Sequence, residues 1–291
     1  MGDILVDVAL PLILAFIMFT LGLGLRIDDF TRVFVQPKSF VTGLANQMVL
    51  LPVAGFLIAS MLGMPPELAV GMMILALCPG GVTTNVLTKI GNGNTALSIS
   101  LTAVVTVVSV VTLPLILTWS VGALMGADTP PVDTLALSLT MFMMTVLPVA
   151  IGMIVTALAP GFVTGAGVTL SRIAVVLFAL IVLAAIATNL DVLRDNIARL
   201  GPATLILMAL MMALGLLTAR ALGLAPRDAT TIAIETGVQN STLGIAVGAI
   251  IADQILGPAE GFSAFALPAA MYGVLMYLLA VPFVLWRRSL H

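Results

Sequence analysis

Hydrophobic residues fill long stretches of this chain, and short groups of turn-forming residues separate the stretches. A helix needs about 20 apolar residues to cross the hydrocarbon core of a bilayer. The connections contain proline, glycine, asparagine or aspartate at residues 65–66, 91–94, 128–131, 160–161, 201–202 and 257–258. The pattern therefore predicts nine membrane-spanning helices, near residues 4–25, 39–62, 68–89, 94–121, 135–158, 170–190, 202–221, 229–253 and 263–286.

The composition agrees with an all-α polytopic membrane protein. Hydrophobic residues make up 61% of the chain and charged residues 8%, and the mean hydropathy is +1.24. The single cysteine, Cys78, excludes a disulfide framework, and the single histidine excludes a Cys/His site for zinc or copper. A net charge of −2 gives no reason to expect a nucleic-acid partner.

The ends and the connections predict one unit in a plasma membrane. No linker or charge run divides residues 1–291, which we interpret as a single transmembrane unit. The N-terminus lacks a basic region and a cleavage site, so we expect a mature first helix and not a signal peptide. All but two of the 11 basic residues fall on one side of the predicted spans, the exceptions being Arg194 and Arg199. The positive-inside rule then places the N-terminus outside and the C-terminus in the cytoplasm.

Two of the predicted spans are interrupted. Pro79 removes a backbone donor in the third span, and Gly80 and Gly81 after it relax the backbone. In the eighth span, residues 235–241 combine a glycine with a run of polar side chains. Non-helical backbone at this depth persists only inside protein or along a watery cavity. One interrupted helix in each half of the chain is typical of an inverted-repeat transporter.

Glu235 is a carboxylate in the middle of a hydrophobic span. An ionised side chain at membrane depth is costly and normally faces a cavity and a partner, so a functional role is the default interpretation. An intramembrane enzyme would need a nucleophile with a base or paired acids, and neither is present in the spans, so we do not expect an enzyme. A channel is disfavoured because no ring of like charges is visible.

Neutral oxygen donors accompany this acid. Such hard ligands suit a hard cation such as sodium. Ser98 and Thr102 lie on one face of the fourth span, although hydroxyls there also commonly bond to their own helix. Gln47 in the second span is equally well explained as a bond between helices. The full donor set is Gln47, Thr83, Thr84, Asn85, Ser98, Thr102, Thr106, Glu235, Gln239, Asn240 and Ser241.

Three motifs of this chain resemble those of the bile acid:sodium symporters. They are residues 78–86 (CPGGVTTNV), residues 93–98 (GNTALS) and residues 235–241 (ETGVQNS). The resemblance extends along essentially the whole chain in helix order and spacing, with the chain beginning at the equivalent of the second helix of ten-helix relatives. It implies core helices at about 39–121 and 202–286 and panel helices at about 4–25 and 135–190. In the core, two broken helices would cross, with two sodium ions behind the crossing.

The resemblance also implies which residues bind the ions and the substrate. The first sodium ion would be held by Thr84, Asn85, Ser98, Thr102 and Glu235. The second would be held by Gln47, Glu235 and Gln239, with the backbone carbonyls of Thr236 and Val238. An organic anion would bind in front of the crossing, at Val82, Thr83, Thr84, Asn240 and Tyr277. Val82 and Met276-Tyr277 are departures, because some relatives carry polar side chains there.

These observations predict a sodium-coupled secondary symporter that imports an organic anion, bile-acid-like or a small carboxylate, by alternating access. The nearest rival is a proton-coupled organic anion carrier or exporter on the same fold, with Glu235 as the proton site. The several oxygens gathered near Glu235 favour sodium, because a proton needs no cage of ligands.

Overall fold

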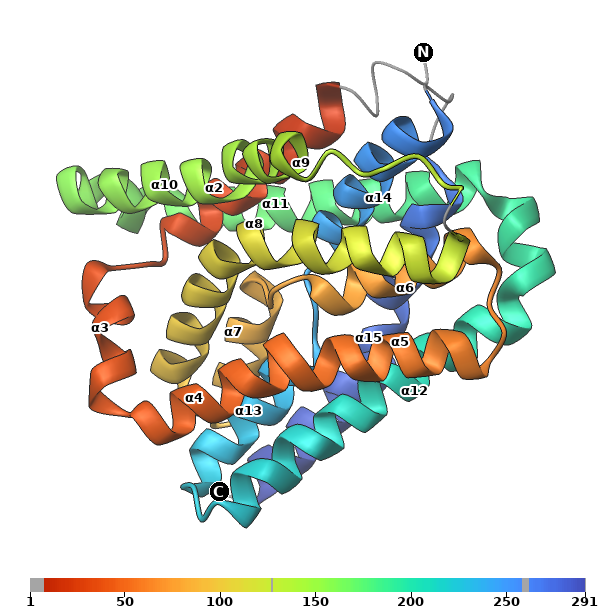
Figure 1. Ribbon diagram of the computed structural model, residues 1–291. Coiled ribbons are helices and arrows are strands. Elements are labelled where there is room, and N and C mark those ends of the chain that lie inside the picture. Colours follow the sequence, from red (N-terminus) through yellow and green to blue (C-terminus); the bar gives the residue numbers. More distant parts are fainter. Residues whose placement is uncertain (1–7, 127, 258–261, 291) are drawn as a thin grey trace.

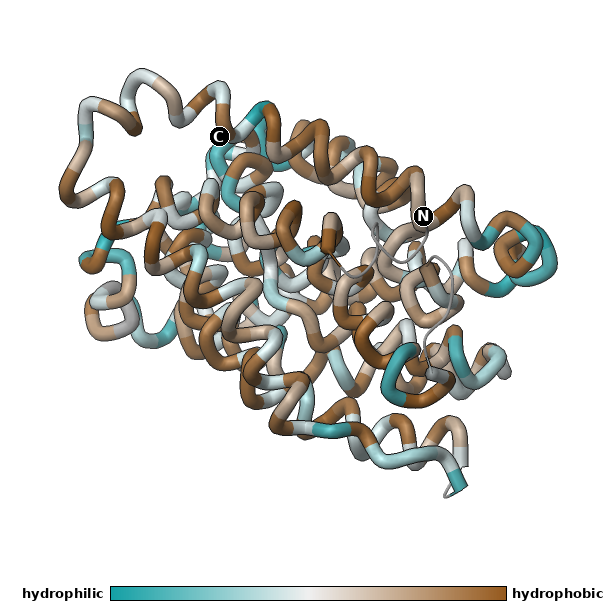
Figure 2. Tube along the Cα trace, turned by 90° about the horizontal axis from the view of Figure 1, so that it is seen from above, coloured by the Kyte–Doolittle hydropathy of each residue, from teal (hydrophilic) through white to brown (hydrophobic). Residues whose placement is uncertain are grey.

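The computed structural model describes residues 8–126, 128–257 and 262–290, and helices account for nearly all of them. Figure 2 shows that apolar residues cover most of the trace, while hydrophilic residues gather mainly at helix ends and connections. The helices are α2 (Leu10–Gly22), α3 (Ile27–Val35), α4 (Pro37–Ala45), α5 (Leu51–Met61), α6 (Pro66–Leu77), α7 (Val82–Ile90), α8 (Thr95–Met125), α9 (Thr134–Met141), α10 (Leu147–Leu158), α11 (Pro160–Thr188), α12 (Leu190–Ala221), α13 (Pro226–Gly237), α14 (Ser241–Leu256) and α15 (Leu267–Ser289). A π-helical turn, η2 (Asn46–Leu50), joins α4 to α5, a second, η3 (Phe142–Val146), joins α9 to α10, and a 3₁₀ turn, η4 (Ala264–Ala266), precedes α15.

The helices confirm a polytopic membrane protein. Within the described ranges, six helices are long and apolar enough to cross a membrane, or seven if α6 and α7 count as one bent span. The expected span 4–25 begins outside the described residues and continues as the short helix α2. The expected span 229–253 is divided between α13 and α14. The count of nine spans therefore stays a prediction.

Both predicted interruptions are present. A bend of 60° separates α6 from α7, with residues 78–81 outside either helix. Residues 238–240 likewise separate α13 from α14, and this light-blue segment passes through the middle of the bundle in Figure 1. The sequence prediction of two broken helices is therefore confirmed.

One predicted turn is wrong. Residues 201–202 lie inside α12, which begins at Leu190 and contains Pro202. A proline within a helix removes only one backbone hydrogen bond, and a long helix continues past it when packing on both sides is retained. Here Leu200 before the proline and Ala203 after it are both fully buried. The same helix packs along α13 and α15, which support it.

Helix α2 packs against α10 and α11, at the top of Figure 1. The approach of α2 to α10 is very close, because a Cβ atom on Gly22 would lie 2.2 Å from the carbonyl oxygen of Val149. On α10, a Cβ atom on Gly152 would lie 2.4 Å from the carbonyl oxygen of Phe19. Small residues let membrane helices approach in this way. A division into panel and core helices stays a prediction.

A buried polar network joins α4, the start of α8 and the start of α13. The Asp228 carboxylate accepts hydrogen bonds from the Ser39 hydroxyl at 2.7 Å and from the Asn94 amide at 2.8 Å. The Asn94 side chain also accepts from the N–H of Leu97 and so caps α8. Asp228 lies in the first turn of α13, where the helix dipole stabilises a negative charge. This network fixes the start of α13, the helix that carries Glu235.

Candidate functional site

The two helix breaks contact each other. The N–H of Asn240 donates a hydrogen bond of 2.9 Å to the carbonyl oxygen of Pro79. The Asn240 side chain accepts from the N–H of Leu243 and so caps α14, whereas α7 begins without a side-chain cap. Two half-helix N-termini therefore lie beside this contact, and both favour negative charge.

Glu235 is fully buried at the C-terminal end of α13, where four side chains from α7 and α8 surround it. The Ser98 hydroxyl donates to Oε1 at 2.5 Å, and the Thr102 hydroxyl lies 3.0 Å from Oε2. The Thr84 hydroxyl lies 3.3 Å from that of Thr102, and the Ser98 hydroxyl lies 2.8 Å from the Asn85 side-chain oxygen. The structure thus brings together all five residues that the resemblance implies for the first sodium ion.

The Glu235 carboxyl group has no charged partner among the described residues. No Lys or Arg among the described residues forms an ion pair with Glu235, whose side-chain partners are hydroxyls. No group of three or more His, Cys, Asp or Glu side chains lies together in the described part of the chain. A buried carboxylate among neutral oxygens suits a monovalent hard cation better than a soft metal.

Gly80 lies against the oxygen donors of this group. A Cβ atom at this position would lie 2.7 Å from Oε2 of Glu235, 3.2 Å from the Thr84 hydroxyl and 3.4 Å from the Thr102 hydroxyl. The space beside the α carbon of Gly80 is therefore bounded by three of the oxygen donors. The hydroxyls of Ser98 and Thr102 now donate hydrogen bonds to the carboxylate. If they turned their oxygens toward a cation instead, these oxygens and the carboxylate would form a chemically suitable set of ligands.

The residues implied for the second ion contact the backbone of the same break. The Gln47 amide donates at 2.7 Å to the Glu235 carbonyl, and the Gln239 amide donates at 2.8 Å to the Thr236 carbonyl. Val238 is fully buried in extended backbone next to them. The side-chain oxygens of Gln47 and Gln239 are buried and have no hydrogen-bond partner. A buried acceptor without a donor costs free energy, so both amide oxygens are available to a ligand.

The residues implied for the anion line a cavity of about 70 Å³ between the breaks, α2, α11 and α15. Val82, Thr83, Asn240 and Tyr277 all line it. Thr84 does not, because its side chain is fully buried in the Glu235 group. The Asn240 amide nitrogen lies 4.0 Å from the sulfur of Met18 on α2, on the cavity side of the break.

Ser241, which the resemblance does not assign to the anion, also lines this cavity. Its hydroxyl is buried and has no hydrogen-bond partner. As the first residue of α14, it lies where an anion would meet the free N–H groups of that helix. Its place at a helix start after Asn240 is visible in the sequence, but its lack of a partner is not.

A second cavity of about 800 Å³ adjoins the first, with Thr20, Val82, Ser171 and Val175 lining both. Its walls are largely apolar, and Lys89 and Arg172 are the charged residues that line it. An apolar cavity lined by cations attracts an anion with an apolar body, because low-dielectric walls focus the field.

The sequence model of the Sodium Bile acid symporter family matches residues 11–196. The chain belongs to this family. It is 29% identical over 272 residues to the probable sodium/metabolite cotransporter BASS1, chloroplastic, of Arabidopsis thaliana, covering 94% of the chain and 65% of the relative. It is 31% identical over 238 residues to the uncharacterized sodium-dependent transporter YocS of Bacillus subtilis, covering 82% and 73%. It is 29% identical over 247 residues to the human ileal sodium/bile acid cotransporter, covering 83% and 69%.

The chain spans only part of the length of these curated relatives, and 54% of the rice BASS2 protein. Family membership confirms the resemblance found in the sequence. The match to the family model ends before Glu235, while the alignment with the Arabidopsis protein covers enough of the chain to include it.

Proposed function

We propose that the chain is a sodium-coupled symporter that imports an organic anion by alternating access. The observation that supports this most strongly is the fully buried Glu235, which hydroxyl donors surround and which has no basic partner among the described residues, at the contact between two broken helices. Sodium coupling also agrees with the names of the relatives, which call them sodium-dependent transporters or cotransporters.

In the proposed first site, sodium binds Glu235, Ser98 and Thr102 together with Thr84 and Asn85. In the second, it binds Glu235, Gln47, Gln239 and the carbonyls of Thr236 and Val238. Both glutamine amides now present N–H groups to backbone carbonyls. Rotation of each amide would turn its oxygen toward the ion, so that the amide oxygens and the backbone carbonyls coordinate the same ion. Two ions would share one carboxylate, which links the two sites electrostatically.

The two proposed sites should be separable by mutation. Thr102→Val removes a hydroxyl from the first and Gln47→Ala removes an amide from the second. We expect each variant to lower the Hill coefficient for sodium from near two toward one, measured by thermal stabilisation of the purified protein in sodium against choline. Thr112→Val is the control on α8, because its hydroxyl bonds to Val108 of its own helix. A wild-type coefficient near one, unchanged in both variants, would contradict two ions.

The anion is proposed to bind the N–H groups at the starts of α7 and α14, with Thr83, Asn240, Ser241 and Tyr277 around it and Val82 on an apolar wall. An apolar body would extend into the wider cavity, toward Lys89 and Arg172. The substrate class is therefore a monocarboxylate, small or amphipathic. Recognition by backbone N–H groups depends on charge more than on the shape of the tail.

Carboxylic acids should therefore bind better than their amides. We expect each acid from butyrate to decanoate, and cholate, to stabilise the protein in sodium with an affinity roughly tenfold or more above that of its primary amide, about 1.4 kcal/mol. Changes of tail length should alter the affinity gradually. Amides that bind as well as acids would contradict an anion site, and binding of a single tail length would contradict the apolar, permissive cavity.

The proposed direction follows from the orientation predicted by the basic residues. Lys89 and Arg172 would then lie on the cytoplasmic side, so the wide cavity would open inward. With two sodium ions and one monoanion, one net positive charge enters per cycle, worth about 2.3 kcal/mol per 100 mV. A tenfold sodium gradient adds about 1.4 kcal/mol per ion, so accumulation could reach roughly a few thousandfold. A proton-coupled carrier would instead respond to a pH gradient in the absence of sodium.

A further inference from the structure

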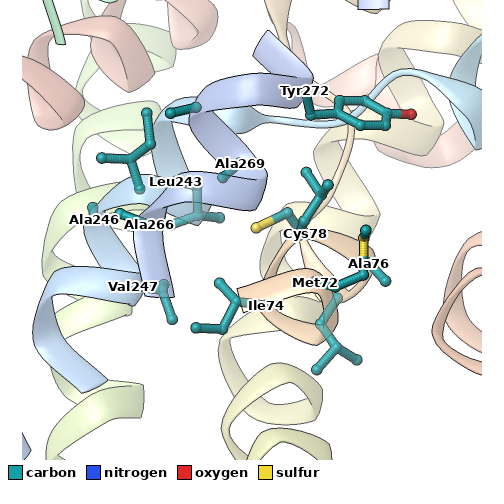
Figure 3. Close-up of a cluster of buried hydrophobic side chains, with 14 of the residues drawn as sticks. Met72, Ile74, Ala76, Cys78, Leu243, Ala246, Val247, Ala266, Ala269 and Tyr272 are labelled. Carbon is teal, nitrogen blue, oxygen red and sulfur yellow. The ribbon is translucent and has the colours of Figure 1, made fainter. Parts of the chain in front are cut away.

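Tyr272 on α15 contacts the second helix break. Its side chain is 1% exposed, and its hydroxyl donates a hydrogen bond to the carbonyl oxygen of Gly237, the last residue of α13. Figure 3 shows the ring at the edge of a hydrophobic cluster that includes Leu243 and Ala269, with the hydroxyl pointing away from them. The apolar cluster therefore anchors the ring, and the hydroxyl is left to act on the break.

Three successive backbone carbonyls at this break each accept from a different side chain. The carbonyls of Glu235 and Thr236 accept from Gln47 and Gln239, and that of Gly237 accepts from Tyr272. The last carbonyls of a helix have no partner within it, so these donors satisfy groups that the break leaves open. The two amides carry an oxygen that could replace the N–H after rotation. The tyrosine hydroxyl is held by its ring and stays a donor.

Without the hydrogen bond from Tyr272, the backbone at Gly237 would be free to rotate. A Cβ atom here would lie 2.0 Å from Cγ of Met212 on α12, so the packing of α12 against α13 requires glycine. Glycine also permits many backbone conformations. The peptide group after Gly237 lies between the carbonyls of Thr236 and Val238, the two proposed for the ion. A rotation about the Cα–C bond of Gly237 that the φ angle of Val238 does not compensate changes the direction of the Val238 carbonyl relative to that of Thr236.

We propose that Tyr272 is a positioning residue for the second sodium site. It holds the Gly237 carbonyl against α15, which keeps that oxygen out of the ion's shell and fixes the peptide group on which the Val238 carbonyl depends. This inference rests on the proposed function and adds a residue to it from a helix that contributes no ligand to the ion. It also makes the position of α15 a determinant of sodium affinity.

The test uses Tyr272→Phe in the full-length purified protein without substrate. The variant keeps the ring in the hydrophobic cluster and removes the hydroxyl. We expect the sodium concentration for half-maximal thermal stabilisation, measured against choline at constant ionic strength, to rise about fivefold, the effect of one lost hydrogen bond. If the phenylalanine variant does not fold, p-aminophenylalanine at position 272 tests the same contact, since its N–H donor should give a midpoint within about twofold of the wild type.

Leu267→Val is the matched control, because Leu267 is a fully buried residue of the same helix whose shortening lowers stability without changing a donor. It should lower the melting temperature without moving the sodium midpoint. An unchanged midpoint in Tyr272→Phe, or an equal shift in Leu267→Val, would overturn the positioning role alone. Absence of any sodium response in the wild-type protein would overturn the proposed function and this inference together.

Discussion

Replacing Glu235 with glutamine is expected to abolish sodium-dependent transport and the stabilisation of the purified protein by sodium. The amide keeps the size of the side chain, and Ser98 and Thr102 retain a partner because its oxygen accepts from one hydroxyl and its NH2 group donates to the other. What is lost is the negative charge that both proposed ions share. We expect the sodium midpoint to rise roughly 100-fold or more, about 3 kcal/mol, the range for removing one partner of a buried ion pair.

Asp191→Asn is the control for the loss of a carboxylate. Asp191 lies on α12 with its side chain 95% exposed and pairs with Arg194 at 3.5 Å. An exposed pair of this kind contributes little, so this variant should respond to sodium as the wild type does. Sodium-driven uptake at the wild-type level by Glu235→Gln would contradict the shared-ligand role.

Gly80→Ala should have an effect nearly as large, without changing any proposed ligand. The added methyl group would enter the space between the Glu235 carboxylate and the hydroxyls of Thr84 and Thr102. A sodium ion could then reach these oxygens only if the break between α6 and α7 moved. We expect the sodium midpoint to rise at least tenfold, about 1.4 kcal/mol, in the same thermal-stabilisation measurement.

The matched control is Gly122→Ala on α8, where an added Cβ atom meets nothing within 4 Å. Alanine is favoured over glycine inside a helix, so this variant should be as stable as the wild type or more stable, with an unchanged sodium midpoint. A normal midpoint in Gly80→Ala would mean that the ion does not occupy the space between these oxygens.

The features predictable from the sequence were those that are local along the chain. One break is marked by Pro79 with two glycines after it, and the other by Glu235 within an apolar stretch. Both stand out because unpaired backbone groups and ionised side chains are costly in lipid wherever they occur. The motifs then identified the family, which the comparisons confirm. The start of α12 was misjudged because a glycine and a proline at residues 201–202 look like a turn, while the burial that keeps the helix continuous comes from distant helices.

The remaining features depend on which helices pack together. Whether the oxygens of Gln47 and Gln239 have partners is decided by distances between η2, α13 and the second break. The contact of Tyr272 with Gly237 joins residues 35 positions apart on two helices. In a sequence Tyr272 is an aromatic residue in an apolar helix, which is typical of a core position, and nothing local reveals that its hydroxyl reaches the break.

Equilibrium binding of radioactive sodium to the purified protein, in the absence of any substrate, tests the central claim most directly. We expect saturable binding that approaches two sodium ions per chain, displaced by unlabelled sodium and not by choline, and strongly reduced in Glu235→Gln. Undiminished binding in Glu235→Gln, or no saturable binding to the wild type while a pH gradient alone drives organic anion uptake, would contradict it and favour a proton-coupled carrier.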